Sequence, residues 1–396
     1  MMDILKIEIK DQVFASGVRS DCFQPSLAQL GDGQILTIQP LYGGDYYGEV
    51  SFSRRQRGCD IWSDPEIIPA FRRRSCNIAD IEEAVVDVRS IALPDEKLVL
   101  AVGASSFYTP RECAFWDPAI DRRQLPKQRA VYSFFDAEKN CWSEPGFITS
   151  ADCGENGDLR IACAQMAQMA DGKLVLPVYF ATAELVDYAG VKWPRQAVKT
   201  LIARVVGNQL KIEAWSNALT IGVERGFVEP SVKEFNGKWY MTIRAEDGKA
   251  YITTSTDALN WQKPQPWRWS DTLEDLATDS TQQHFLTLGG KLYLCFTRAD
   301  ESNAMVPRRR TPLFIAQVNT ENLTLLRESE QIIFPLVIKD GISNMQGNFH
   351  CVELSPDLAA VVDGALYITP GNETKAAIYR SCLQISYIKS EEKNEV

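Results

Sequence analysis

The sequence predicts an all-β fold, a six-bladed β-propeller of four-stranded antiparallel blades that occupies residues 1–396 as a single domain. Three observations lead to this prediction. Helical periodicity is weak along the whole chain, one tight-turn signature recurs between short apolar runs, and the intervals between these turns are similar enough to close into a ring.

The tight-turn signature places Asp-Gly, Asn-Gly, Gly-Gly or a related pair directly before an apolar run. Such pairs supply the positive φ angles that a two-residue hairpin turn needs. Five instances lie at residues 30–36, 95–99, 171–175, 236–240 and 289–293, and we expect a sixth at 355–357. The six intervals, counted around the chain ends, are each roughly 50 to 80 residues long, which is typical of radial repetition with one antiparallel sheet per unit.

The first ten residues alternate charged and apolar side chains, which predicts a strand. We expect this strand to pair with residues 383–388 as the outer strand of the last blade, closing the ring and covering two sheet edges. The N-terminus has no apolar stretch of signal-peptide length, and the chain has no run of about 18 apolar residues. We therefore expect neither a signal peptide nor a membrane span.

Composition argues against nucleic acid as a partner. The chain has 42 Lys and Arg against 52 Asp and Glu, a formal charge of -10 that repels polyanions. Its two basic runs, at 72–74 and 308–310, are shorter than a polybasic interaction segment.

Ten cysteines without a Cys-x-x-Cys pair suggest reduced, buried thiols in a cytoplasmic protein, with disulfides as the alternative. The oligomeric state is left open.

A second recurring motif points to a family. Residues 255–261 read Ser-Thr-Asp-Ala-Leu-Asn-Trp, and weaker forms lie at 135–143 and 58–63. These segments resemble the Asp-box of sialidase-type (BNR-repeat) propellers, in which the Ser and Asp brace a hairpin at the outer rim of a blade and the Trp packs between strands. The resemblance implies a structural role for them.

The strongest resemblance lies in residues 226–244, where Glu229-Pro230-Ser231 precedes an inner strand and Arg244 ends the next one. This arrangement resembles the corresponding stretch of sialidases. Residues 281–285 and 307–318 resemble a bacterial group of sialidase-like propellers classed with the glycoside hydrolases.

One position departs from the family. Sialidases begin their first blade with Arg-Ile-Pro, whose Arg helps to bind the substrate carboxylate, whereas this chain has Phe23-Gln24-Pro25, and neither Phe nor Gln can form a bidentate ion pair.

Residues at the head of each inner strand should converge on the axial channel, and counting back from the turns reaches several polar side chains. We expect Glu229 to act as a general base, or to activate a Tyr nucleophile as the resemblance implies, and His284 to transfer protons. The alternatives are an ion pair between Glu229 and Arg244 and a structural role for His284. The expected substrate-binding residues are Arg244, Arg298, Arg309, Gln24, Gln283 and His350.

Aromatic residues in the longer loops, among them Trp116 and Trp193, could stack on sugar faces, although core packing is an equally good explanation. No third ligand lies at metal-binding distance along the chain from either histidine, so we expect no metal and no other cofactor.

Three functions fit these residues. The first is a sialidase-like glycoside hydrolase that acts on a terminal, acidic sugar. The second is β-elimination next to a uronate, with His284 or a Tyr as the base. The third is a carbohydrate-binding propeller without turnover.

Overall fold

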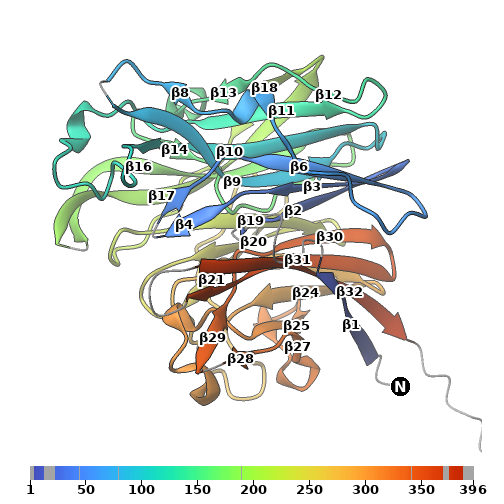
Figure 1. The fold of residues 1–396 in the computed structure, drawn as a ribbon. Helices are drawn as coiled ribbons and strands as arrows, with labels where there is room; N and C mark the ends of the chain where they lie inside the picture. The colour runs from blue at the N-terminus through green and yellow to red at the C-terminus, as the bar shows by residue number, and fades with distance from the viewer. Residues whose placement is uncertain are drawn as a thin grey trace, which may run out of the picture.

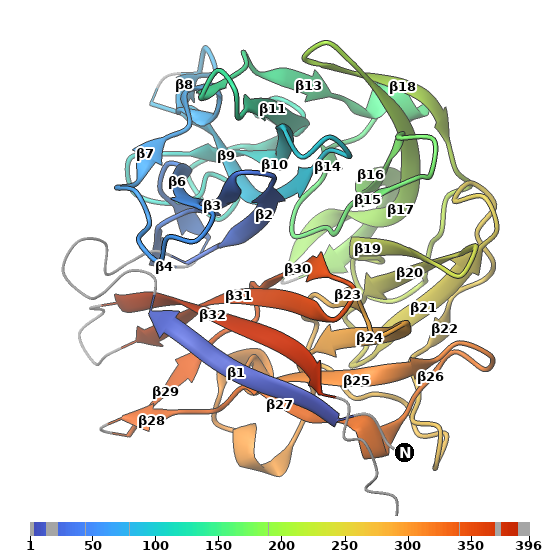
Figure 2. The same ribbon diagram turned by 90° about the vertical axis from the view of Figure 1, so that its right-hand side faces the viewer.

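The computed structural model describes residues 4–12, 23–43, 45–78, 80–188, 190–339, 341–368 and 374–386. Six antiparallel sheets radiate around a common axis, and Figure 2 looks down that axis whereas Figure 1 shows the ring from the side. The described residues contain no α-helix and no helix that could cross a membrane. The prediction of a six-bladed, all-β propeller is confirmed.

The strands follow one another blade by blade. Blade 1 contains β2 (Ser26–Leu30), β3 (Gly33–Ile38), β6 (Ser51–Gln56) and β7 (Glu66–Ile67), with the hairpin β4 (Leu41–Gly43) and β5 (Tyr46–Tyr47) inserted. Blade 2 contains β8 (Arg74–Ser75), β9 (Glu82–Ala92), β10 (Leu98–Tyr108), β11 (Ala130–Asp136), β12 (Cys141–Trp142) and β13 (Gly146–Ile148). Blade 3 contains β14 (Leu159–Arg160), β15 (Ala167–Gln168), β16 (Leu174–Tyr188), β17 (Val191–Val206) and β18 (Gln209–Trp215).

The second half of the ring has the same plan. Blade 4 contains β19 (Val228–Phe235), β20 (Lys238–Arg244), β21 (Ala250–Ser255) and β22 (Gln265–Pro266). Blade 5 contains β23 (His284–Leu288), β24 (Lys291–Phe296), β25 (Leu313–Asn319), β26 (Thr324–Leu325) and β27 (Gln331–Phe334). Blade 6 contains β28 (Ile338–Lys339), β29 (Ile342–Met345), β30 (His350–Ser355), β31 (Leu358–Ile368), β32 (Thr374–Ser386) and β1 (Ile4–Gln12). Short 3-10 helices lie between strands at Pro69–Phe71, Arg122–Gln124, Ser150–Cys153, Glu301–Asn303, Pro307–Arg309 and Arg327–Ser329.

Each predicted turn joins the innermost strand of a blade to its neighbour. In blade 4 the turn residues Asn236 and Gly237 have φ values of 51° and 73°, and in blade 5 Gly289 and Gly290 have 54° and 70°. Positive φ at both central positions defines the hairpin turn whose twist matches that of the strands. The turn signature therefore identified the inner hairpins, including the sixth, which joins β30 to β31.

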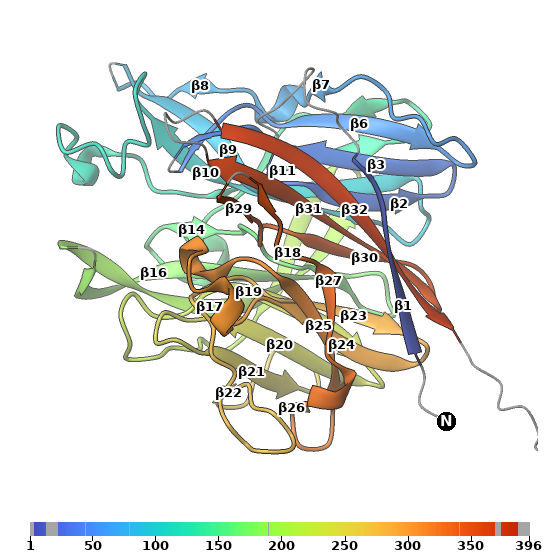
Figure 3. The ribbon, with the colours of Figure 1, turned by 60° about the horizontal axis from the view of Figure 1, so that its bottom comes forward.

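The N-terminal strand closes the ring. Strand β1 pairs antiparallel with β32, with Ile7 opposite Leu383, and Figure 3 shows the two lying side by side. Leu5 is buried in an apolar cluster that also contains Leu313 and Ile333 of blade 5. The first and last strands of the chain thus share one blade, as predicted.

The space along the axis is filled by side chains. The guanidinium of Arg89 is fully buried and donates hydrogen bonds to Gln282 Oε1 at 3.1 Å and to the carbonyl of Phe349 at 3.2 Å. The rings of His284 and Phe349 pack edge to face with centroids 4.9 Å apart. A ligand can therefore enter the described channel from its mouths but not pass along it.

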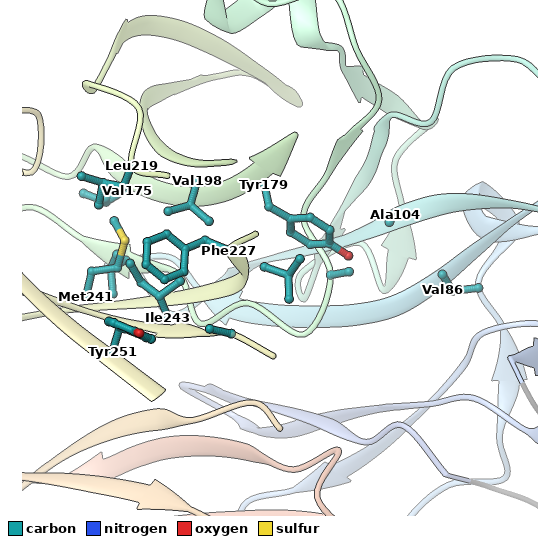
Figure 4. Close-up of a cluster of buried hydrophobic side chains, with 14 of the residues drawn as sticks. Val86, Ala104, Val175, Tyr179, Val198, Leu219, Phe227, Met241, Ile243 and Tyr251 are labelled. Atoms are coloured by element: carbon teal, nitrogen blue, oxygen red, sulfur yellow. The ribbon is translucent and has the colours of Figure 1, made fainter. Parts of the chain in front are cut away.

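Apolar clusters fill the gaps between blades. The cluster drawn in Figure 4 lies between blades 3 and 4, where Val198 and Leu219 pack against Phe227 and Met241. It extends through Tyr179 toward blade 2 and reaches one mouth of the channel. Packing between blades thereby supports the walls of that mouth.

The structure describes eight of the ten cysteines as free thiols, five of them buried. Cys22 and the side chain of Cys382 lie outside the described residues.

The hairpin at 255–261 has the contacts expected of a bracing motif. Asp257 accepts hydrogen bonds from Ser255 Oγ at 2.8 Å and from the backbone amides of Leu259 and Asn260 at 2.9 and 2.8 Å. The indole of Trp261 is buried and donates to Thr200 Oγ1 of blade 3 at 2.9 Å. This hairpin therefore links blades 3 and 4.

Candidate functional site

A polar pocket opens at the mouth of the channel where the inner strands begin. All six blades contribute to it: the inserted hairpin of blade 1, the inner strands of blades 2 to 4, the loop between β24 and β25 of blade 5, and the start of blade 6. Its charged and phenolic lining residues are Asp45, Tyr47, Asp87, Tyr108, Arg160, Tyr179, Tyr188, Arg225, Glu229, Arg244, Arg308 and Arg310.

Three neighbouring blades share an unusual backbone feature at this mouth. Asp87, Cys163 and Glu229, in blades 2, 3 and 4, all have left-handed φ angles, of 58°, 52° and 48°. In blades 2 and 4 the ladder shows a bulge there, so that two residues face one on the partner strand. A left-handed non-glycine residue costs of order 1–3 kcal/mol and is typical of functional sites. The three residues place two carboxyl groups and a thiol on the pocket wall.

Glu229 forms a tight ion pair with Arg244. Arg244 Nη1 lies 2.6 Å from Glu229 Oε1, and the two side chains are 5% and 14% exposed, respectively. Arg244 also donates from Nε to Ser280 Oγ at 2.9 Å. Burial would raise the pKa of Glu229, but the charge and the hydrogen bond of Arg244 outweigh it, so the pKa is lowered. Glu229 is therefore ionised at neutral pH while still lining the pocket.

Asp87 has the opposite tendency. Gln24 Nε2 donates to Asp87 Oδ1 at 2.5 Å and to the hydroxyl of Tyr47 at 3.1 Å. Burial, followed by the negative charge of Glu229, raises the pKa of Asp87 to about 6, against the opposing charge of Arg89. About a tenth of this carboxyl group keeps its proton at pH 7, and about half does so near pH 6.

Sequence reasoning missed Asp87 because the turn of blade 2 is longer than that of blade 4: Asp95 lies three positions beyond the end of β9, whereas Asn236 directly follows β19. The count of seven positions back from the turn at Asp95 ended on Val88, one residue too late. The signal was present, since Asp87 precedes Asp95 by eight positions and Glu229 precedes Asn236 by seven. An acid at nearly the same place in two blades indicates two carboxyl groups facing one channel.

The phenols of the pocket are held neutral. Burial raises the pKa of Tyr47 and of Tyr108 well above the usual range, and raises that of Tyr179 to about 12. The carboxyl groups nearby add to the effect on Tyr47 and Tyr179. In the free protein these hydroxyls can donate hydrogen bonds but do not ionise near neutral pH.

Several arginines in the pocket have no carboxylate partner. Among the described residues, neither Arg308 nor Arg310 forms an ion pair, and Arg310 Nη1 instead donates to Asn348 Oδ1 at 2.7 Å. Burial, then the charges of Arg244 and Arg308, lowers the pKa of Arg310. An anionic ligand would relieve this repulsion, because it would supply the missing negative charge.

The rim of the pocket is aromatic on one side. The indole of Trp116 stacks on that of Trp193 with centroids 5.7 Å apart and an interplanar angle of 13°. Trp116 Nε1 donates to Asp45 Oδ2 at 2.9 Å, which joins the β10–β11 loop of blade 2 to the inserted hairpin of blade 1.

The two histidines do not reach this pocket, which corrects the expected role of His284. His284 is 0% exposed, its Nδ1 lies 2.9 Å from Ser231 Oγ, and burial followed by the charge of Arg89 lowers its pKa well below the usual range. His350 is also buried, with a pKa lowered to about 3, and lines a depression at the opposite mouth. The inner strands carry both rings into the channel interior, where no substrate group can contact His284.

Three other expected residues also lie outside the pocket lining. Arg298 pairs with Glu330 at 2.8 Å and Asp300 at 2.9 Å beside a separate surface depression. Arg309 pairs with Asp279 at 3.1 Å, although its neighbours at 308 and 310 face the pocket. Gln283 accepts from Thr242 Oγ1 at 3.1 Å within the blade packing. Because successive strand residues point to opposite faces, an error of one position in register moves a side chain out of the site.

Of the residues expected from the sequence, the structure therefore brings Glu229 and Arg244 together in the pocket, and Gln24 contacts it through Asp87. The single pocket expected to hold Glu229, Arg244, His284 and Arg298 is corrected to the first two of these residues. In the described part of the chain, no cluster of three His, Cys, Asp or Glu side chains is placed to hold a metal ion.

Comparison with solved structures finds the same fold in sialidases. Trypanosoma rangeli sialidase in complex with the inhibitor DANA superposes with a TM-score of 0.59 at 14% identity, over 92% of this chain and 55% of that one. Hadza microbial sialidase Hz136 gives a TM-score of 0.60 at 13% identity, over 93% of this chain and 67% of that one. A protein of unknown function from Dyadobacter fermentans DSM 18053 gives 0.59 at 16% identity, over 96% and 98% of the two chains.

The chain thus spans little more than half the length of the Trypanosoma rangeli enzyme. No protein-family model and no curated protein sequence matches it. At these identities the comparison shows the fold, which is a sialidase-like six-bladed propeller.

Proposed function

We propose that this protein is a glycoside hydrolase that releases a terminal, anionic sugar. One observation carries the proposal. A single pocket holds an ionised carboxylate, Glu229, and a carboxyl group whose pKa is raised to about 6, Asp87, next to arginines without a carboxylate partner. Two carboxyl groups whose pKa values are driven apart by their surroundings are the basis of acid and base assignment in glycosidases.

In the proposed reaction, protonated Asp87 donates its proton to the glycosidic oxygen as the bond from that oxygen to the anomeric carbon breaks. Ionised Glu229 stabilises the positive charge that develops on the sugar ring. Water adds its hydroxyl to the anomeric carbon and releases a proton, which returns to the carboxylate of Asp87. The products are the free sugar and the leaving alcohol.

The anionic group of the sugar would bind Arg308 and Arg310, which have no ion pair within the described residues. Proteins that share the fold support a sugar of this class, because Trypanosoma rangeli sialidase was solved in complex with sialic acid. The neutral phenol of Tyr47 accepts from Gln24 and is available to donate a hydrogen bond to a further oxygen atom, whereas Tyr108 donates to the carbonyl of Asp45 at 2.9 Å.

Hydrolysis fits the pocket better than β-elimination. Elimination needs a base that removes a proton next to the carboxylate. His284 lies outside the pocket, and the tyrosines of the pocket have raised pKa values, so neither residue type supplies that base in the free protein. A propeller that binds sugar without turnover remains the competing outcome of the test.

The test compares leaving groups on one anionic sugar. We expect wild-type protein to hydrolyse 4-nitrophenyl and methyl glycosides of glucuronic acid or N-acetylneuraminic acid. Glu229→Gln should lower kcat by about 100-fold or more with both leaving groups. Asp87→Asn should lower kcat by about 100-fold or more for the methyl glycoside and far less for the nitrophenyl glycoside, which departs without a proton.

Glu234→Gln is the matched control, because Glu234 is an exposed carboxylate on the same strand as Glu229 and lies outside this pocket. Equal losses of activity with both leaving groups in Asp87→Asn would contradict proton donation by Asp87. Dependence on the leaving group in Asp45→Asn instead would assign the proton to Asp45 at the rim. Binding of the sugars without any turnover by wild-type protein would identify a binding propeller.

A further inference from the structure

The pocket lining has more arginines than carboxylates. Its arginines, among the described residues, are Arg160, Arg225, Arg244, Arg308 and Arg310. Arg225 and Arg244 are each paired with a glutamate, at 2.8 and 2.6 Å. The other three form no ion pair within the described part of the chain. A sugar carboxylate bound at positions 308 and 310 therefore leaves Arg160 without a negative partner.

Arg160 lies on the other side of Glu229 from Arg308 and Arg310. It ends β14 of blade 3, whereas Arg308 and Arg310 belong to the loop between β24 and β25 of blade 5. Blade 4, which carries Glu229, packs against blade 3 on one side and blade 5 on the other, as Figure 2 shows. A sugar ring that contacts Glu229 consequently has an unpaired arginine on either side.

The guanidinium of Arg160 is fixed before any ligand binds. Its Cζ lies 5.8 Å from the ring centroids of both Phe115 and Tyr179. Its Nη2 donates to Gln128 Oε1, and Gln128 is itself held in place because its Nε2 donates to the carbonyl of Ser105 at 2.7 Å. A preorganised guanidinium loses little conformational entropy when it binds an oxyanion.

The charge of this partly buried guanidinium is not balanced locally. Its Nε is buried and has no hydrogen-bond partner among the described residues. Asp158, two positions earlier in the chain, accepts from the backbone amide of Gln128 at 2.7 Å and forms no ion pair with Arg160. Removing a charge from water without a counter-charge is unfavourable. An anionic group that binds Arg160 would offset this cost.

Tyr179 adds a neutral donor beside Arg160. Figure 4 shows its hydroxyl directed away from Phe227 and toward Ala104, which lines the pocket. Burial raises the pKa of Tyr179 to about 12, so the hydroxyl keeps its proton. A single fixed positive charge next to a neutral donor fits an oxyanion with a single negative charge. A sulfate ester is such a group, whereas a phosphate monoester carries about 1.5 to 2 negative charges at neutral pH.

We propose that Arg160 binds a sulfate ester on the terminal sugar, so that the substrate is a sulfated acidic sugar whose carboxylate contacts Arg308 and Arg310. The sulfate ester is a recognition group, and no bond to it breaks. This inference rests on the proposed function for the position of the sugar in the pocket, and it adds a second anionic group to that sugar.

The experiment measures the binding of free monosaccharides, which have no glycosidic bond to hydrolyse, to the wild-type protein. Calorimetric titrations compare glucuronic acid and N-acetylneuraminic acid with their monosulfate isomers. We expect one monosulfate to bind about tenfold more tightly than its parent acid, because it forms an additional ion pair with a partly buried arginine. Arg160→Gln should reduce this ratio to within about twofold of one and leave the affinity for the parent acid unchanged.

Arg204→Gln is the matched control. Arg204 pairs with Glu213 at 2.8 Å on β17 of the same blade, is 48% exposed and lies outside the pocket lining, so its loss changes the net charge equally. It should leave the ratio intact. Arg160→Lys keeps the charge but loses the planar fork, so it should retain part of the ratio. This variant also provides the measurement if thermal unfolding shows that Arg160→Gln is not folded.

The outcomes separate the two proposals. A parent acid that binds with no gain for any of its monosulfates, or an equal gain in Arg160→Gln, overturns the sulfate site and leaves the proposed function intact. A gain that depends on Arg160, in a protein that hydrolyses none of the glycosides, supports the sulfate site and overturns the proposed hydrolysis. Equal or tighter binding of the corresponding monophosphates overturns the assignment of a singly charged group. Failure of every sugar to bind overturns both proposals.

Discussion

The left-handed conformation shared by Asp87, Cys163 and Glu229 is the most informative feature of single residues in this protein. Asp87 lies within β9, Cys163 between β14 and β15, and Glu229 near the start of β19. None of them is glycine, so each conformation is held against its intrinsic preference. Regular strands at these positions would satisfy the backbone with less strain. The bulges direct the side chains of Asp87 and Glu229 into the pocket, and this placement is the functional benefit of the strained backbone.

The raised pKa of Asp87 predicts that this carboxyl group, which the proposed reaction needs, lowers the stability of the fold at neutral pH. Its pKa of about 6 in the folded protein exceeds its value of about 4 in the unfolded chain, so the fold favours the protonated form. Its contribution to stability is therefore greatest below pH 4 and falls as pH rises from about 4 to about 6. Above that range the ionised group destabilises the fold by on the order of 3 kcal/mol.

Replacement of Asp87 by Asn removes this titration and keeps an oxygen that can accept from Gln24. We expect urea unfolding at pH 7.5 to show Asp87→Asn as more stable than wild type by on the order of 1–3 kcal/mol, with the difference vanishing near pH 4. Asp60→Asn, at an exposed position, should change stability by less than about 0.5 kcal/mol at both pH values. A destabilised Asp87→Asn variant at pH 7.5 would contradict this account.

At the scale of elements, the hairpin at 255–261 joins blade 4 to blade 3 by hydrogen bonds outside the sheets. Asp257 organises the turn, and the hydrogen bond from the backbone amide of Asn260, followed by other donors in the turn, lowers the pKa of its carboxylate. Trp261 then donates across to Thr200. The motif fixes the spacing of two blades without contributing a side chain to the pocket.

Loss of this turn should affect stability and not activity. Asp257→Ala leaves four donors without their acceptor, so we expect a loss of about 1–3 kcal/mol in unfolding free energy with an unchanged KM for any substrate found. The difference should shrink as pH falls below about 4, since the low-pKa carboxylate stabilises the fold only while it is ionised.

Asp136 offers the comparison, because it accepts from two backbone amides in the weaker motif at 135–143. Asp136→Ala should cost less than Asp257→Ala in the same unfolding assay. A change in KM for Asp257→Ala larger than twofold would show that blade spacing is transmitted to the pocket.

At the scale of the whole molecule, the ring could be predicted because its signal is repeated. Each inner hairpin has its own turn residues, as at Asn236 and Gly237, so an error at one blade does not change the number of blades. The site has no such redundancy. The count that reached Glu229 failed at Asp87 because of a longer turn after β9, and the burial of His284 depends on Arg89 and Phe349 from other blades.

Long-range contacts of this kind leave no pattern in a single sequence. Arg298 and Arg309 had suitable chemistry, but their carboxylate partners at Glu330 and Asp279 lie 32 and 30 positions away along the chain. Trp116 reaches Asp45 across 71 positions. Residue type and local spacing therefore predicted which groups could act, and packing decided which of them face the pocket.

Ring closure by β1 predicts a specific defect when that strand is absent. Deletion of residues 1–12 removes the partner of β32 and the buried side chain of Leu5. We expect a lower Tm and concentration-dependent self-association, because an unpaired edge strand pairs with other chains. Size-exclusion chromatography with light scattering and thermal unfolding check both effects.

Leu5→Ala and Ile9→Ala test the same strand without exposing its edge. Leu5 is 6% exposed and Ile9 is 48% exposed, so the first substitution should cost about 2–4 kcal/mol and the second less than about 1 kcal/mol. A truncated protein that stays monomeric with an unchanged Tm would show that the closing strand contributes nothing to the ring.

The pairing of β1 with β32 also sets an order of events during synthesis. A ribosome makes β1 first and β32 last, and blades 1 to 5 can each pair their own strands as they emerge, because their hairpins are local. Blade 6 cannot be completed until nearly the whole chain has been translated, so β1 must remain unpaired until then. A nascent chain of this protein consequently carries one strand without its partner for most of its synthesis, and that strand is the segment to which a chaperone would bind.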